Sequence, residues 1–123
     1  MQIGENMIPR EFLLAAAVKA AYRQSAKDEK PTRIEDISRN LFSLSQSGIS
    51  LGEISLKRIP GGFYSEDVEI LVGHFLDANF AVRRSPVQLT TEGEKVLDTI
   101  IHQEKKKNPE GVRKIEAVLG KLG

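Results

Sequence analysis

The chain contains no cysteine and no tryptophan among its 123 residues. The absence of cysteine excludes a disulfide scaffold, a cysteine zinc site, an iron–sulfur cluster and a thiol nucleophile. The longest apolar run, Phe12–Val18, is far shorter than the ~20 residues that span a bilayer. The first residues carry no basic stretch ahead of an apolar segment, so no signal peptide is expected. We therefore expect a cytoplasmic protein without a membrane partner.

Motifs of the common enzyme classes are also missing. The sequence has no nucleophile elbow, phosphate-binding loop, dinucleotide-binding glycine pattern or zinc-protease helix. Its two histidines, His74 and His102, each have an aspartate at helical spacing, Asp77 and Asp98 respectively. Neither has a second histidine at ligand spacing, which favours ordinary packed or exposed histidines over a metal site. We expect no enzymatic activity, no cofactor and no metal.

What is present is the composition of one soluble domain, 40% hydrophobic and 28% charged. Two separate cores would leave about 60 residues each, which is marginal, so residues 1–123 are expected to form one domain. Helical periodicity predicts helices over Arg10–Gln24, Thr32–Gln46, Ser65–Phe80 and Pro109–Leu122, and another from Thr91 to Lys105–Lys107.

The ends of these helices carry recognisable signals. Thr32 with Glu35, and Thr91 with Glu94, match the capping-box spacing. Ser65 is a candidate N-cap ahead of acidic residues, which favour the positive end of a helix. Asn79 can adopt the left-handed conformation that ends one.

Two other segments are predicted to contain strands. Ala81–Leu89 has the pattern of a β-hairpin with a Ser85-Pro86 turn. Ile49–Ile59 holds no single period, so Ser55–Ile59 could be a short strand or Gly52 could begin a helical turn. The sequence therefore predicts a mainly α fold with a small β-hairpin, of α+β class.

Charge is distributed unevenly along the chain, although the net charge is only +1. Residues 65–80 hold four acidic groups and no Lys or Arg, whereas the segments before and after carry net charges of +2 and +3. On the side of the predicted helix opposite its apolar residues lie Glu66, Glu69, Ile70 and Asp77. This acidic face would suit a basic protein partner.

The order of elements resembles that of a winged helix-turn-helix protein of the broad MarR/PadR-like class of transcriptional regulators. The resemblance covers about residues 10–103. Its most specific part, Phe63–Ile101, combines a helix, a short wing and the Leu-Thr-x-x-Gly pattern of Leu89, Thr90 and Gly93. The family resemblance implies DNA binding, with residues 65–80 in the recognition position and 81–89 as the wing.

The resemblance also implies which residues would contact double-stranded DNA and which would form a homodimer. The wing positions are Arg83, Arg84, Ser85 and Gln88, and Arg33, Arg39, Lys57 and Arg58 are flanking cations that could bind phosphates. Residues 10–24 and 109–122 are candidate dimerisation helices, the latter through a coiled-coil-like seam of Val112, Ile115, Leu119 and Leu122. Two alternatives remain open: the seam could pack on the chain's own core, and the scaffold could bind a protein through the acidic face.

Overall fold

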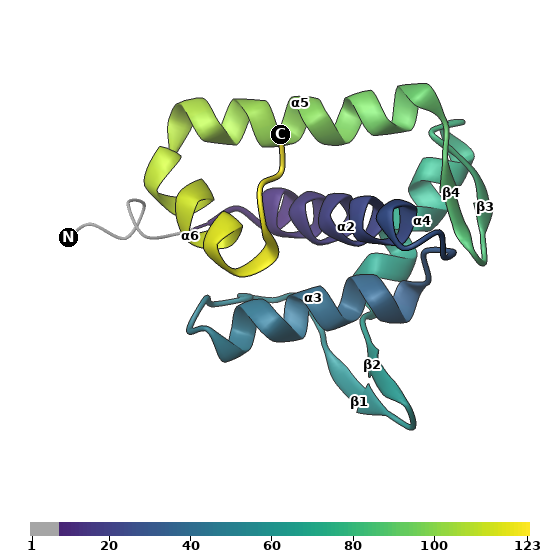
Figure 1. The fold of residues 1–123 in the computed structure, drawn as a ribbon, viewed down its shortest axis with the longest axis horizontal. Helices are drawn as coiled ribbons and strands as arrows, with labels where there is room; N and C mark the ends of the chain where they lie inside the picture. The colour runs from purple at the N-terminus through teal and green to yellow at the C-terminus, as the bar shows by residue number, and fades with distance from the viewer. Residues whose placement is uncertain (1–7) are drawn as a thin grey trace.

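The computed structural model describes residues 8–123, which form five helices and two small antiparallel hairpins (Figure 1). The helices are α2 (Arg10–Lys27), α3 (Ile34–Gln46), α4 (Glu66–Asp77), α5 (Thr91–Lys107) and α6 (Pro109–Leu119). The strands are β1 (Lys57–Ile59), β2 (Gly62–Tyr64), β3 (Ala81–Arg84) and β4 (Val87–Leu89). The predicted mainly α, α+β class is thus confirmed. In this part of the chain, no helix combines the length and apolar character needed to cross a membrane.

Helix α2 lies at the centre of the fold, with α3 on one side and α5 on the other (Figure 1). Every side chain from Phe12 to Val18 is buried, and Ala16 and Ala17 are fully inaccessible to solvent. Small alanine side chains allow neighbouring helices to approach closely, which is why this segment occupies the middle of the core. The candidate dimerisation helix, residues 10–24, thus buries its apolar residues Phe12–Val18 within the chain itself, and its part in a homodimer stays a prediction.

The start of α3 differs from the predicted Thr32 capping box. Arg33 is the N-cap residue, and the Asp36 carboxylate accepts a hydrogen bond from its backbone N–H at 3.0 Å. Thr32 is instead buried and forms an isolated bridge with Val87, whose N–H donates to the Thr32 carbonyl at 2.7 Å. The bridge ties the α2–α3 connection to strand β4.

The ambiguous segment before residue 60 forms strand β1, and β2 pairs with it across a turn at Pro60-Gly61. Gly61 has φ of +87°, a conformation that glycine adopts without strain. The hairpin reaches beyond α3 (Figure 1), and β2 packs on α3 through Phe63, the middle residue of the strand, whose ring stacks on Phe42. The centroids of these rings are 4.0 Å apart.

Helix α4 begins where the sequence predicts. The Ser65 hydroxyl accepts from the Val68 N–H at 3.4 Å, and the Ser65 N–H donates to the Ser38 hydroxyl of α3 at 3.0 Å. The helix ends at Asp77, earlier than the predicted Phe80, and Asn79 takes the left-handed conformation with φ of +64°. Burial of Val68 on the core side fixes which face of α4 is exposed.

The predicted hairpin of residues 81–89 is confirmed as β3–β4, with a cis Ser85-Pro86 bond at its turn. The following helix is capped by Thr90, one residue before the predicted Thr91, because the Thr90 hydroxyl accepts from the Gly93 N–H at 3.0 Å. Gly93 is buried against the backbone carbonyl of Phe80.

Helix α6 packs against α2, α3 and α5, and it ends at Leu119 rather than Leu122. Val112 and Ile115 are buried in the core, and Leu122, beyond the helix, is buried as well. Leu119 is partly buried against the same core. The predicted intermolecular seam is therefore an intramolecular packing surface, which was the alternative open from the sequence.

Candidate functional site

Helix α4 directly follows the β1–β2 hairpin and precedes the β3–β4 hairpin in the chain, and one side of this helix is exposed. We call this side the α4 surface; it includes Glu66, Glu69, Ile70, Gly73, His74 and Asp77. Together with Leu76 and Arg84, these residues line a shallow depression of about 430 Å³. Ile70 is 48% exposed; among the described residues, Val82 of β3 is the other large apolar side chain that is exposed.

One of the four acids of α4 has a structural role instead of belonging to this surface. The Asp67 carboxylate accepts hydrogen bonds from the Ser55 N–H and hydroxyl, at 2.6 and 2.9 Å, and pairs with Arg10. Burial raises the pKa of Asp67, but the hydrogen bonds from Ser55 and Arg10 outweigh this and hold the pKa below its ordinary value. Asp67 thereby ties the start of α2 and the segment before β1 to the start of α4.

A second acid, Glu69, is paired with the wing. Its carboxylate lies 3.7 Å from the Arg84 guanidinium, which also passes over Gly73. A Cβ atom at position 73 would lie 3.6 Å from Arg84 Nη2, an ordinary van der Waals contact, so the arginine lies along this part of the helix. Arg84 is therefore turned toward α4, and its charge is partly compensated there.

Arg83, the neighbouring wing residue, is exposed and pairs in register with Gln88, which is exposed as well. Within residues 8–123, Arg83 makes no ion pair. Ser85 at the turn is also exposed. The structure thus separates two arginines that are adjacent in sequence, one facing α4 and one available to a partner.

The β1–β2 hairpin presents two further cations on an aromatic support. The Lys57 ammonium lies 5.5 Å from the centroid of Tyr64, and the Arg58 guanidinium lies 5.2 Å from that of Phe63. Neither cation forms an ion pair with any acid of the described chain. The two cations were candidates from the sequence, but the aromatic residues beneath them were not. The sequence signal for them is the apolar Ile59 before Pro60-Gly61-Gly62 and the aromatic Phe63 and Tyr64 after it, a pattern typical of a hairpin.

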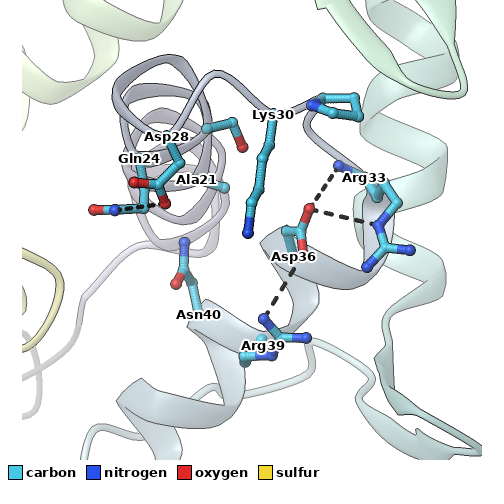
Figure 2. Close-up of a pocket in the computed structure, with 10 residues that line it drawn as sticks. Ala21, Gln24, Asp28, Lys30, Arg33, Asp36, Arg39 and Asn40 are labelled. Carbon is cyan, nitrogen blue, oxygen red and sulfur yellow. Dashed lines mark hydrogen bonds and ion pairs between the residues drawn. The ribbon is translucent and has the colours of Figure 1, made fainter.

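Arg33 and Arg39 do not line the depression on the α4 surface but a separate pocket between α2 and α3 (Figure 2). Both guanidinium groups approach the carboxylate of Asp36, at 3.8 and 3.7 Å respectively. Lys30 also lines this pocket, and its side chain extends between the two helices (Figure 2). Lys30 was not a candidate from the sequence because its segment resembles a charged surface loop.

The histidines show no joint arrangement. His74 is exposed on the α4 surface, and Asp98, the predicted neighbour of His102, pairs instead with Lys19 of α2. No group of three or more candidate metal ligands occurs in residues 8–123.

Comparison of the chain with protein-family models, curated proteins and solved structures found no match.

Proposed function

We propose that the chain is a winged-helix protein that binds double-stranded DNA, chiefly through backbone phosphates contacted by its two hairpins. The observation that carries this proposal is the placement of Lys57, Arg58 and Arg83 on hairpins at both ends of α4. All three cations are exposed and free of ion pairs within the described residues. Cations in this state bind phosphates and release counterions, the main source of DNA affinity.

The connectivity supports the winged-helix part of the proposal. A bridge between Thr32 and Val87 adds a short extended segment to β4, between α2 and α3 in sequence. The order is then helix, bridge residue, helix, β1–β2 hairpin, helix and β3–β4 hairpin, with β4 anchored to the helical body. The β1–β2 hairpin between α3 and α4 is an addition to the helix-turn-helix order. Such an anchor would hold the wing in a fixed direction relative to α4.

Phosphate contacts account for the charge of α4 better than base readout does. Glu66 and Asp77 remain exposed there, and a carboxylate repels phosphates and can accept only from the amino groups of cytosine or adenine in the major groove, so this helix is poorly suited to read bases. Asp67 and Glu69, in contrast, are engaged with cations of the chain itself. We therefore propose binding with weak sequence preference, as expected when contacts to phosphates dominate.

The test is a fluorescence-anisotropy titration with a long duplex of mixed sequence at low salt. Arg83→Ala should weaken binding and lower the slope of log K against log salt by about 1. Lys106→Ala, which removes an exposed cation in the last turn of α5, is the matched control and should have little effect. Figure 1 shows that this end of α5 is opposite to the β3–β4 hairpin. No binding of the unaltered protein at low salt would refute the proposal.

Exposure of Ile70 within the acidic α4 surface favours a second candidate, a protein-interaction module for a basic partner. A pull-down from native lysate should then recover one stoichiometric protein, and Ile70→Asp should abolish its recovery. Recovery of nucleic acid alone would count against this candidate. For either function, a homodimer would need a surface other than the buried seam of α6.

A further inference from the structure

A basic pocket lies between the end of α2 and the first turns of α3 (Figure 2). Its volume is about 430 Å³, and its lining includes Lys30, Arg33 and Arg39 together with the carboxylates of Asp28 and Asp36. Three cations around a cavity of this size form a candidate site for an anion. The three cations can bind an anion only if the carboxylates of Asp28 and Asp36 leave some of their N–H donors unpaired.

The carboxylates are engaged mainly with other groups. Asp28 accepts a hydrogen bond from the Gln24 side-chain amide at 3.0 Å. Asp36 accepts from the Arg33 backbone N–H at 3.0 Å, which caps α3. Its distances to the Arg33 and Arg39 guanidinium nitrogens, 3.8 and 3.7 Å, exceed the range of a hydrogen bond.

The cations therefore keep free donors. Each guanidinium carries five N–H donors in a planar fork that matches phosphate oxygens. Arg33 and Arg39 have side chains 60% and 53% exposed, so a ligand can reach them from solvent. Lys30 is exposed and makes no ion pair with a described residue, and its side chain reaches toward the space between Asp28 and Asp36 (Figure 2).

The pocket is joined directly to the wing. Arg33 follows Thr32, whose carbonyl accepts the 2.7 Å hydrogen bond from Val87 of β4. The pocket and the β3–β4 hairpin are thus held together by a hydrogen bond between two segments that are distant in sequence. This link places Arg33 next to a residue that is bonded to the wing.

We propose that this pocket binds a phosphate group through Lys30, Arg33 and Arg39, and that DNA supplies it as a backbone phosphodiester. That the phosphate group comes from DNA rests on the proposed function. That the pocket recognises a phosphate group rests on the pocket alone. Asp36 limits the affinity because its charge lies beside the site. The same carboxylate caps α3.

The experiment measures duplex binding by anisotropy and inorganic pyrophosphate binding by calorimetry for the same variants. Lys30→Ala and Arg39→Ala should each weaken duplex binding by about tenfold, as expected for loss of a charge-assisted contact. Asp36→Asn keeps an oxygen that can accept the cap hydrogen bond but removes the charge, so it should tighten binding several-fold. Lys27→Ala is the matched control, because Lys27 is exposed at the end of α2 but does not line the pocket. Thermal unfolding verifies that each variant is folded.

The outcomes separate the inference from the proposed function. If Arg83→Ala weakens duplex binding while the Lys30, Arg39 and Asp36 variants bind like the unaltered protein, the pocket proposal is overturned and the proposed function stands. If duplex binding is absent but pyrophosphate binds and is lost in Lys30→Ala and Arg39→Ala, the pocket is supported and a free phosphate compound is its ligand. Equal weakening by Lys27→Ala would also overturn the proposal, since it would show diffuse charge rather than a site.

Discussion

Gly93→Ala is the substitution for which the structure implies the largest local conflict. An added Cβ would lie 1.9 Å from the Phe80 carbonyl oxygen and 2.8 Å from its carbonyl carbon. Real Cβ atoms essentially never come within 3.0 Å of a heavy atom, so the start of α5 would have to move by more than 1 Å. The obstacle is backbone, which cannot rotate out of the way as a flexible side chain can.

The required movement disturbs a small network of hydrogen bonds. Thr90 donates its N–H to the Phe80 carbonyl at 3.0 Å, and its hydroxyl joins the Asn79 carbonyl to the Gly93 N–H. Overpacking alone costs typically 1–3 kcal/mol, and loss of an N-cap costs about 1 kcal/mol more. We expect Gly93→Ala to lower the free energy of unfolding by about 3 kcal/mol, out of the ~5–15 kcal/mol typical of a domain.

Gly73→Ala provides a matched control on a neighbouring helix. Its added Cβ would meet only Arg84 Nη2, at 3.6 Å, which is ordinary contact. Alanine is favoured over glycine in a helix by roughly 0.5–1 kcal/mol, so this variant should be as stable as the parent or slightly more stable. Urea unfolding followed by circular dichroism measures both variants. A Gly93→Ala protein within about 0.5 kcal/mol of the parent, below the overpacking range, would refute the reasoning.

Two further predictions concern stability and association. Because the pKa of Asp67 is lowered in the folded state, its stabilising contribution is present above the unfolded pKa of about 3.9 and is lost as the pH falls through the folded pKa. Asp67→Asn should therefore flatten the decrease of unfolding free energy with acidification in urea titrations, and parallel curves would contradict the assigned contacts. Ile115→Ala should cost about 2–5 kcal/mol, because the side chain is fully buried in the core. Light scattering should show the same oligomeric state for this variant as for the parent, and a change in mass would indicate that the α6 seam lies between molecules.

The sequence predicts the helices well because their signals are local. Apolar periodicity locates all five, and the Ser65 cap and the left-handed Asn79 are where the sequence places them. Both capping boxes are displaced by one residue for a reason that is not local. Thr32 is held by Val87, 55 positions away in sequence, and Thr90 is held by the carbonyls of Asn79 and Phe80.

The spacing of apolar residues along a helix likewise does not predict which surface they pack against. Val112, Ile115 and Leu122 repeat as a coiled-coil seam does, yet they pack on the chain's own core. A narrow stripe shows that a helix face is buried but does not distinguish an intramolecular surface from an intermolecular one.

In the candidate site, too, some features can be predicted from the sequence and others depend on the fold. Its cations can be named from the sequence, since Lys57, Arg58 and Arg83 are adjacent to turn signals. The compensation of Asp67 by Arg10 and of Glu69 by Arg84 depends on tertiary contacts, and a count of charges along α4 therefore overstates its repulsion of DNA.

The most direct test of the central claim is the salt dependence of duplex binding by the triple variant Lys57→Ala/Arg58→Ala/Arg83→Ala, compared with the parent. If the two hairpins contact phosphates, the slope of log K against log salt should fall in magnitude by roughly 3, one for each cation removed. Thermal unfolding of the triple variant verifies that loss of the cation–aromatic contacts has not unfolded it. A folded variant with the slope and affinity of the parent would contradict the claim that the hairpins hold DNA.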